Sequence, residues 1–427
     1  MLQKVRSLVH KKSFRNSLWI ISERIFQALV SFILTILTSR YLGPANFGVL
    51  DYGATIVSFF AVITKLGIDN ILVNELLKHR NIEGAILGTS AILRLASSFL
   101  SILLIIILVL VLENDSPLII VTTVLQAFSL IFQALAVPES WFQSRLESKY
   151  VSIAKAISYS IVASYKAFLL ITNKDVTWFA VSNVIDFALI AGVELVLYKE
   201  KNGPRISFDK KWAKRIIDQS RHFIISGLLV LIYTQIDKIM IGSMLGSRSL
   251  GLYSAALKLC TIWSFVPEAI ISSAKTIIFS LKQSKNNYLI RLKQTYFIVF
   301  WGCSFVAAII TLCGPLLINV VFGEDYSDAV TTLQILVWFM PLSQLGAARN
   351  IWLISENLSR YAKRFAAYGV VVNIGMNAIL IPIMGINGAA LATVITEVIT
   401  CFIAPLFYKE TRKGASLICS SLCLNLK

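Results

Sequence analysis

Charged residues interrupt apolar stretches that would otherwise suit the interior of a lipid bilayer. The first such stretch, WIISERIFQALV at residues 19–30, contains the adjacent ionised pair Glu23 and Arg24. A charge near the middle of a bilayer costs about 2.5–3.5 kcal/mol on insertion scales, so each one is expected to have a partner or a function. A cation in such a place is a natural partner for a phosphate or pyrophosphate group.

Other apolar stretches contain further cations and acids. The cations that we select as candidate contacts for an anionic headgroup or a sugar are Arg24, Lys258, Arg349, Arg94 and Lys238. For each of them the alternative is snorkelling toward the membrane surface or pairing with a nearby acid. The acids that we select as candidate sites for ion coupling are Asp51, Asp237 and Glu268. Their alternative is a simple ion pair with one of the cations.

The residue types argue against a catalytic or metal site. The 6 cysteines form no CxxC pair and the chain has only 3 histidines, so neither a metal centre nor a redox site is expected. No catalytic residue is proposed, and no cofactor is expected beyond a coupling H⁺ or Na⁺. The net charge of +17 lies in short clusters between apolar runs, which argues against a nucleic-acid partner.

Helices that cross a membrane would have to position these charges. The chain of 427 residues is 56% hydrophobic and only 15% charged, against about 25% charged residues in soluble domains. Apolar runs approach the roughly 20 residues that a spanning helix needs, so an all-α polytopic membrane protein is predicted. We place twelve spans at 17–39, 47–66, 84–112, 117–141, 150–171, 177–198, 222–245, 250–273, 295–321, 329–354, 362–383 and 387–408.

The loops between these spans carry unequal charge. One alternating set holds most of the 40 Lys and Arg residues, whereas the other set holds only Arg40, Lys174 and Arg248. Positively charged loops stay in the cytoplasm. The pattern therefore predicts that both termini are cytoplasmic and that the number of spans is even.

The two halves of the chain resemble each other weakly, in the same order and at a nearly constant spacing. LGPANFGVL (42–50) matches LGSRSLGLY (245–253), QALAVPESWFQSRLESKY (133–150) matches QLGAARNIWLISENLSRY (344–361), and LYKE (197–200) matches FYKE (407–410). We infer two six-helix bundles, 1–208 and 209–412, followed by a short tail, 413–427. Both would begin in the cytoplasm, as a parallel repeat around a central cavity.

The repeat also bears on the charged pair in the first stretch. The first spacing sets Glu23 and Arg24 against Ser226 and Gly227, which are uncharged. The pair is therefore not a requirement of the repeated scaffold. That asymmetry favours Arg24 as a substrate contact and leaves Glu23 as its partner or a bystander.

Two motifs resemble a known family. RYLGPxxFG follows the first span, and NIGMNAILIPIMGINGAALAT occupies 373–393. Both are similar to motifs of polysaccharide-export proteins in the MATE-like flippase superfamily, and within it the chain looks like the Wzx-type O-antigen flippases over about 1–410. The glycines of both motifs are expected to close tight turns between spans rather than to touch substrate. Members often have a basic residue after the proline of the second motif, whereas here Ile383 and Met384 follow Pro382.

The resemblance implies a transport function rather than an enzyme activity. It implies movement of undecaprenyl-pyrophosphate-linked repeat units from the cytoplasmic to the periplasmic leaflet of the bacterial inner membrane by alternating access. Polymerase and chain-length proteins of the same pathway would be partners, together with membrane lipids. A multidrug exporter of the same fold, a membrane polymerase, ligase or glycosyltransferase, and a lipid II flippase are the alternatives. Short outer loops argue against the enzymes, and the short tail argues against a lipid II flippase, which usually has two more spans.

Overall fold

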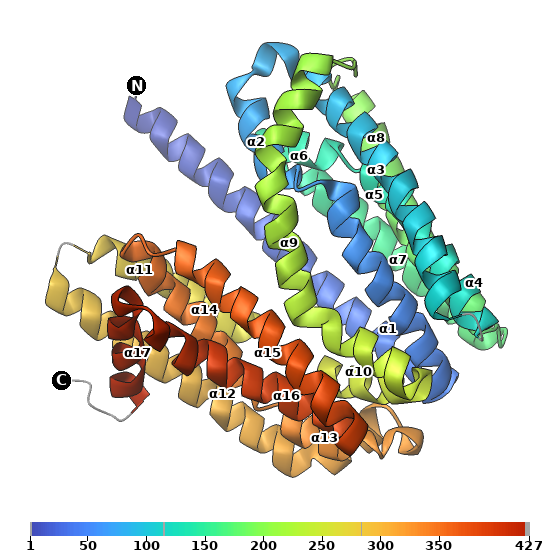
Figure 1. The fold of residues 1–427 in the computed structure, drawn as a ribbon. Helices are drawn as coiled ribbons and strands as arrows, with labels where there is room; N and C mark the ends of the chain where they lie inside the picture. The colour runs from blue at the N-terminus through green and yellow to red at the C-terminus, as the bar shows by residue number, and fades with distance from the viewer. Residues whose placement is uncertain (1, 114–115, 283, 423–427) are drawn as a thin grey trace. The chain divides into compact units, whose positions relative to one another are not determined.

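The computed structural model describes residues 2–113, 116–282 and 284–422, and these residues form helices and turns without a strand (Figure 1). Ten of its helices are long and apolar enough to cross a membrane, or eleven if the bent pair α10 and α11 is one span. Each of the twelve predicted segments coincides with one helix or with consecutive helices separated by a short turn. The prediction of an all-α polytopic membrane protein is confirmed.

The chain forms two compact units, and each is described by itself. The first unit comprises residues 1–42 and 49–228, and the second comprises residues 43–48 and 229–427. The sequence boundary at 208/209 lies in the linker before α9 (Lys210–Leu245), whereas the units divide inside that helix. The first part of α9 packs on the first unit, since Arg215 lies 3.1 Å from the buried Glu75 carboxylate and Phe223 lies against Gly67.

The first unit is built from nine further helices and the start of α9. They are α1 (Leu2–Lys65), α2 (Asp69–Lys78), η1 (Arg80–Ile82), α3 (Glu83–Leu112), α4 (Pro117–Ala127), α5 (Ser129–Leu135), α6 (Pro138–Ser144), α7 (Lys149–Ile171) and α8 (Val176–Glu200). Its core includes Trp141, whose indole N–H donates to Glu83 over 3.0 Å. Asp209 caps α9, because its carboxylate accepts from the backbone N–H of Lys211 at 2.8 Å.

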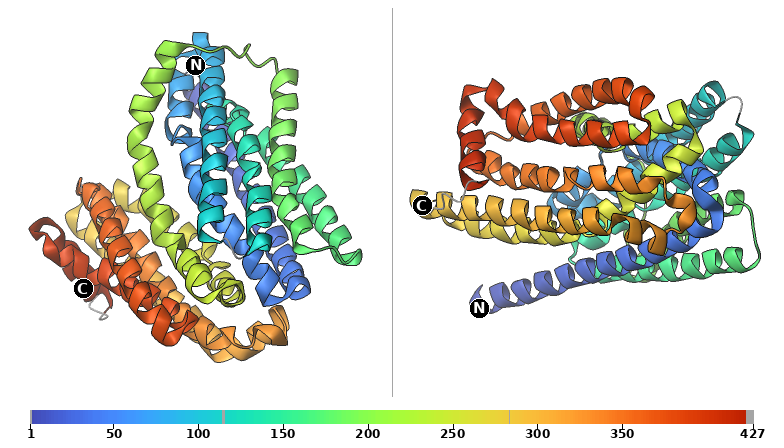
Figure 2. Two further views of the ribbon diagram at one scale, coloured as in Figure 1. Left: turned by 45° about the vertical axis from the view of Figure 1, so that its right-hand side comes forward. Right: turned by 90° about the horizontal axis from the view of Figure 1, so that it is seen from below.

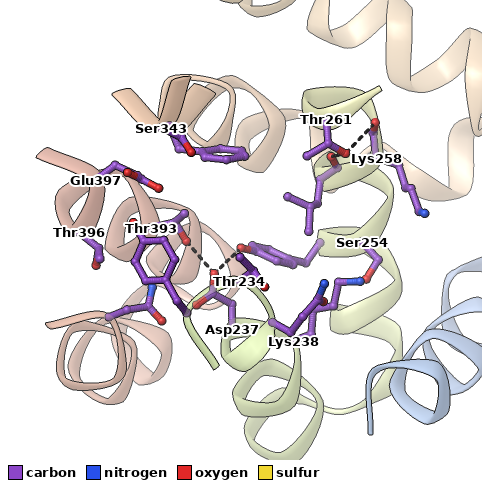
Figure 3. A pocket seen from close by; sticks show the side chains of 16 residues that line it. Thr234, Asp237, Lys238, Ser254, Lys258, Thr261, Ser343, Thr393, Thr396 and Glu397 are labelled. Carbon is purple, nitrogen blue, oxygen red and sulfur yellow. Dashed lines mark hydrogen bonds between the residues drawn. The ribbon is translucent and has the colours of Figure 1, made fainter. Parts of the chain in front are cut away.

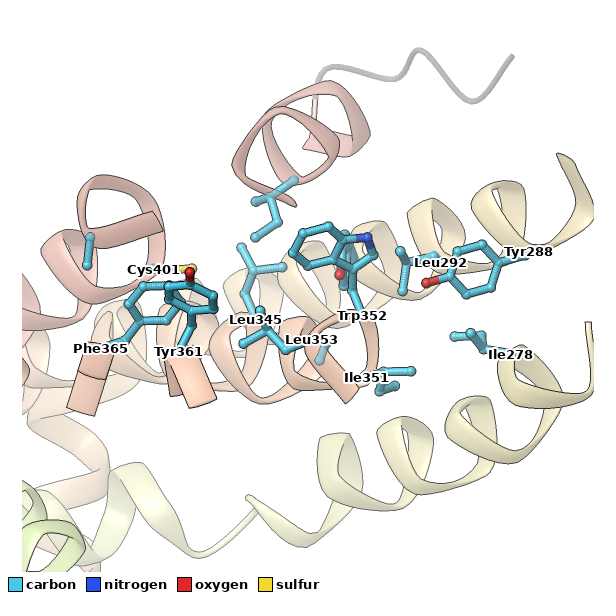
Figure 4. Packing of buried hydrophobic residues seen from close by; sticks show 14 residues of the cluster. Ile278, Tyr288, Leu292, Leu345, Ile351, Trp352, Leu353, Tyr361, Phe365 and Cys401 are labelled. Carbon is cyan, nitrogen blue, oxygen red and sulfur yellow. The ribbon is translucent and has the colours of Figure 1, made fainter. Parts of the chain in front are cut away.

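The second unit continues from α9 through nine more helices. They are α10 (Ser247–Thr261), α11 (Phe265–Ser280), α12 (Lys285–Val321), η2 (Glu324–Tyr326), α13 (Ala329–Leu336), α14 (Phe339–Ser355), α15 (Arg360–Met384), α16 (Ile386–Val398) and α17 (Lys409–Leu422). Between α16 and α17 lie a π-helical turn (Ile399–Ile403) and a 3₁₀ turn (Ala404–Phe407). Trp352, Leu292 and Tyr361 belong to its core (Figure 4).

Four predicted spans are interrupted in the structure, and one of them, 329–354, is divided into α13 and α14 by a turn at 337–338. The segment 117–141 is divided into α4, α5 and α6, and Pro138, which lacks an N–H group, occupies the first position of α6. The segment 250–273 is bent by 42° between α10 and α11. The segment 387–408 leaves the α-helical path at Ile399. Apolar length predicted the existence of these spans but not where their backbone departs from an α-helix.

The glycine motifs form matching turns in the two halves. Gly43 (φ 68°, ψ 172°) interrupts α1 and Gly246 (φ 83°, ψ 175°) precedes α10, and both have a left-handed φ that favours glycine. Within the second unit, a Cβ on Gly48 would overlap the Ser247 backbone and a Cβ on Gly251 would overlap the Pro44 backbone. The predicted turn at Gly43 and Pro44 is confirmed.

The predicted tail contains an ordered helix. α17 begins at Lys409, before the predicted tail, and it packs on α12 and α14 across the second unit (Figure 2). Gly414 lets it lie directly on the ring of Trp352. Residues 423–427 of the predicted tail lie outside the described part of the chain.

Candidate functional site

A polar cavity of about 290 Å³ lies inside the second unit (Figure 3). It is bordered by the second part of α9 and by α10, α14, α15 and α16. Three of the residues selected from the sequence line it, namely Asp237, Lys238 and Lys258. Lys238 and Asp237 are nearly buried, at 8% and 6% exposure, so their charges are held away from bulk water.

Asp237 is the centre of a hydrogen-bond network that joins three further helices. Its carboxylate accepts from the Tyr253 hydroxyl at 3.0 Å, the Thr393 hydroxyl at 2.8 Å and the Asn377 amide at 2.6 Å. Asn377 in turn donates to the Asn373 side-chain oxygen over 3.0 Å. Hydrogen bonds to an ionised group contribute about 1.5–3 kcal/mol each, so the network offsets part of the burial cost of this charge.

The network gathers oxygen atoms around one carboxylate. Besides Asp237 it contains the hydroxyl of Thr393 and the side-chain oxygen of Asn373, which accepts from the same Asn377 amide group that donates to Asp237. The Asn377 side-chain oxygen has no hydrogen-bond partner among the described residues. Hard cations prefer carboxylate, amide and hydroxyl oxygens. In the structure Tyr253, Asn377 and Thr393 donate hydrogen bonds to the Asp237 carboxylate, which can itself accept a proton.

A second carboxylate, Glu397, lies farther along α16 in the same cavity. It accepts hydrogen bonds from Tyr233 and Ser343 and from the Thr400 hydroxyl, the last at 3.4 Å. Arg349 is an electrostatic neighbour of this group. Glu397 is thus surrounded by donors within the protein.

The structure gives Arg349 a local task. Its guanidinium donates to the carbonyl oxygens of Thr400 at 2.7 Å and Cys401 at 3.2 Å, both in the π-helical turn. It also lies 4.7 Å from the ring centre of Phe365. Carbonyls that lose regular helical partners need other donors, and Arg349 supplies them. A substrate contact at Arg349 stays a prediction.

The first unit has a smaller polar cavity of about 220 Å³ in which opposite charges pair. Arg94, at 1% exposure, donates to Asp69, and the Lys155 ammonium lies 2.9 Å from Glu139. Asp186 also lines this cavity, and it accepts from the Ser158 hydroxyl at 2.6 Å. The two ion pairs account for four of the six charged residues that line this cavity, the others being Lys65 and Asp186.

Glu23 and Arg24 take different environments on α1. Glu23 is buried and accepts from the Tyr159 hydroxyl at 3.5 Å, near Lys155. Arg24 is exposed and lines neither the cavity of the first unit nor that of the second. Of the pair, Glu23 is the one that joins the internal charges. A substrate role for Arg24 remains a prediction.

The other candidate acids, Asp51 and Glu268, are not among the residues that line the cavity of the second unit. Asp51 is on α1 after the Gly43 break and is partly buried. Glu268 is exposed in the first turn of α11. Ion coupling at these two positions is untested, whereas Asp237 lies in the network described above.

Sequence reasoning missed the neutral members of that network. Asn373 and Asn377 fall in the motif at 373–393, where only the glycines were interpreted. A signal was present, because the two asparagines are four residues apart and therefore share one face of an apolar helix. Nothing in the sequence predicts that Tyr253 and Thr393 approach the same carboxylate.

The comparisons with known proteins agree with this architecture. Residues 13–276 match the family model described as "Polysaccharide biosynthesis protein". A curated relative, the "Probable flippase AglR" of Haloferax volcanii, is 23% identical over 254 residues, which are 54% of this chain and 53% of the relative. The chain thus spans about half the length of that relative.

Solved transporter structures are similar over nearly the whole chain. The lipid II flippase MurJ in an inward closed conformation has a TM-score of 0.71 and 15% identity, with 95% of this chain and 91% of MurJ covered. An inward-facing multidrug resistance MATE family transporter has a TM-score of 0.70 and 14% identity, with 92% and 96% covered. At such identities the likeness shows a MATE-like fold alone and carries no information on substrate.

Proposed function

Because this chain belongs to the polysaccharide biosynthesis protein family, we propose that it is a flippase for lipid-linked oligosaccharides and has no enzyme activity. The proposed substrate is an O-antigen-type repeat unit on undecaprenyl pyrophosphate. It would move from the cytoplasmic to the periplasmic leaflet of a bacterial inner membrane by alternating access. The curated relative, itself a probable flippase, supports the activity class.

The observation that carries the proposal is a polar cavity, lined by two lysines and two carboxylates, inside an apolar helical unit. Lys238 and Lys258 border it together with the hydroxyl-bearing Ser254 and Thr261. Ammonium groups bind phosphate oxygens, and hydroxyl groups bind sugars. The cavity volume of about 290 Å³ suits a headgroup portion, such as a pyrophosphate or one sugar, rather than a complete repeat unit.

Asp237 is proposed as the ion-coupling residue. A proton or Na⁺ at this carboxylate would alter the charge beside Lys238, its neighbour on α9, and the hydrogen bonds to α10, α15 and α16. Ion binding at Asp237 would then change the affinity of the cavity for substrate, because Lys238 lies next to Asp237 on α9. The transport rate would then depend on the concentration of the H⁺ or Na⁺ that binds Asp237.

The proposed orientation is supported by the distribution of charge in the loops. The cation-rich loops would face the cytoplasm, with both termini. Substrate would be loaded from that side, and the polymerase and chain-length proteins of the pathway would consume it on the other. Tags at either terminus of a functional chain should be reached by an impermeant reagent only after the membrane is opened.

Deletion of the gene, followed by assignment of lipid-linked sugars to a leaflet, tests the proposal. Undecaprenyl-linked single repeat units should accumulate and be protected in intact spheroplasts from an impermeant lectin or glycosidase. Accumulation of single units already accessible on the periplasmic face would contradict a flippase and favour a polymerase. Unaltered surface polysaccharide with a new sensitivity to cationic drugs would favour a multidrug exporter.

A further inference from the structure

Arginine and tyrosine side chains gather where α15 begins and α17 begins. The Arg364 guanidinium carbon lies 5.2 Å from the ring centres of both Tyr361 and Tyr408. Arg360 lies 5.1 Å from the Tyr361 ring, and the Tyr361 and Tyr408 rings are 4.8 Å apart. The Tyr408 hydroxyl is 2.6 Å from the Tyr368 hydroxyl. We name these five residues the arginine–tyrosine cluster.

The surroundings of this cluster are strongly positive. Residues 360–364 and 408–413 contain six cations, Arg360, Lys363, Arg364, Lys409, Arg412 and Lys413, and a single acid, Glu410. Glu410 lies 3.9 Å from Arg360. Its pKa is below the ordinary value, because its own backbone N–H and the Tyr361 hydroxyl donate to it and because Arg360 and Arg364 are near. One carboxylate leaves most of this positive charge unbalanced.

The cluster lies at the boundary between apolar and polar surface. Arg360 is the first residue of α15, a helix of membrane-spanning length. At 1.5 Å per residue, Arg364 is about 6 Å and Tyr368 about 12 Å farther along the helix axis. The neighbouring Phe407 and Val371 are 62% and 72% exposed, as expected of side chains that face lipid. Lipid phosphates occupy this depth of a bilayer.

The protein holds the cluster in place. Tyr361 is 3% exposed and belongs to the hydrophobic core of the second unit, beside Phe365 (Figure 4). Tyr408 is fixed by the start of α17, where Thr411 donates to the Pro405 carbonyl at 2.6 Å. Two rings thus fix the plane of the Arg364 guanidinium, and its N–H donors lie along the edge of that plane.

We propose that the arginine–tyrosine cluster is a binding site for the phosphate of an anionic phospholipid. Arg364 binds phosphate oxygens with its N–H edge, the Tyr368 and Tyr408 hydroxyls hydrogen-bond the phosphate or the glycerol, and Phe407 packs against the acyl chain. The excess positive charge selects anionic over zwitterionic lipids. Under the proposed orientation this lipid belongs to the cytoplasmic leaflet, but the site itself does not depend on flippase activity.

Native mass spectrometry of the full chain in detergent, titrated with phosphatidylglycerol or phosphatidylcholine, tests the site. Phosphatidylglycerol should bind the unaltered chain at least about fivefold more tightly, and Arg364→Gln should remove most of that preference. Arg364→Lys should be intermediate, since it keeps the charge but loses the planar stacking. Arg291→Gln is the matched control, because this arginine near the start of α12 is exposed and hydrogen-bonds the Gln294 side chain outside the arginine–tyrosine cluster.

Three results would overturn the proposal. One is equal binding of the two lipids by the unaltered chain. Another is an equal loss of phosphatidylglycerol binding in Arg364→Gln and Arg291→Gln, which would indicate a diffuse charge effect. Thirdly, if undecaprenyl pyrophosphate alone displaces bound phosphatidylglycerol at equimolar amounts, the site belongs to substrate instead. Because no transport is measured, failure of the proposed function leaves each of these outcomes unchanged.

Discussion

The two halves of the chain share their turns but differ in the chemistry of their cavities. Gly43 and Gly246 adopt nearly the same backbone conformation. In the cavity of the first unit, charges pair with opposite charges, as in Arg94 with Asp69. In the second unit, Asp237 is held by neutral donors. The two halves thus share a turn geometry, whereas the hydrogen bonds that hold Asp237 in the second unit come from the neutral side chains of Tyr253, Asn377 and Thr393.

The largest effect is expected at the shared scaffold. Gly48→Ala and Gly251→Ala should each destabilise the fold by more than about 3 kcal/mol, above the usual cost of overpacking, because the added methyl meets backbone atoms that cannot rotate away. The measurement is the yield of monodisperse protein and its melting temperature in detergent.

Gly375→Ala provides the control for this pair, because a Cβ there would meet no atom within 4 Å. If Gly48→Ala melts like Gly375→Ala, the close crossing of these two turns is not required for stability.

The next effect is expected at Asp237. Asp237→Asn keeps a similar shape but removes the charge, so transport should fall by at least about tenfold, equivalent to about 1.4 kcal/mol. Surface display of polysaccharide in a complemented deletion strain measures the effect, with protein level in the membrane as the reference. Glu324→Gln, an exposed acid of the same unit outside the cavity, is the control. Equal surface display in Asp237→Asn and Glu324→Gln would contradict a specific role of the Asp237 charge in transport.

A smaller effect is expected at Lys258. Lys258→Ala should lower transport about three- to tenfold, because one cation facing the anionic headgroup is lost. Lys258→Arg should restore part of it. The same complementation assay applies, and Lys275→Ala, an exposed cation of α11, serves as its control. If Lys258→Arg is as defective as Lys258→Ala, Lys258 has a steric role rather than a charge contact.

The smallest effect on transport is expected in the first unit. Arg94→Gln breaks the pair with Asp69, whose side chain is 49% exposed and can be solvated by water. We expect a loss of about 1–2 kcal/mol of stability, below the range for fully buried pairs, and less than a twofold change in transport per folded molecule. A double-mutant cycle with Asp69→Asn in thermal unfolding measures the pair. A large transport defect without a stability change would place substrate at Arg94.

Much of the fold could be read from the sequence because membrane helices are dictated by apolar length. The twelve segments and the turn at Gly43 follow from local signals that need no tertiary information. The break at α10 and α11 and the π-helical turn depend on side chains from elsewhere in the fold. Arg349 illustrates this, because its hydrogen bonds to the carbonyls of Thr400 and Cys401 require α14 to pack beside that turn.

The candidate site could be predicted only in part. Asp237, Lys238 and Lys258 were recognisable because charges inside apolar helices are costly and therefore conspicuous. Asn373, Asn377 and Thr393 were not, because neutral polar side chains are common in such helices and can hydrogen-bond to their own backbone. Their common hydrogen-bond network around Asp237 forms only when α9, α15 and α16 pack together.

The stabilities of the two units are linked because both include part of α9. Its first part packs on one unit through Arg215 and Glu75, and its second part carries Asp237 and Lys238 into the cavity of the other. Fraying of this helix would remove a packing partner from the first unit and cavity-lining residues from the second. Heat or denaturant should therefore unfold the described helices in one cooperative transition rather than two, and protease treatment should release neither unit as a stable fragment.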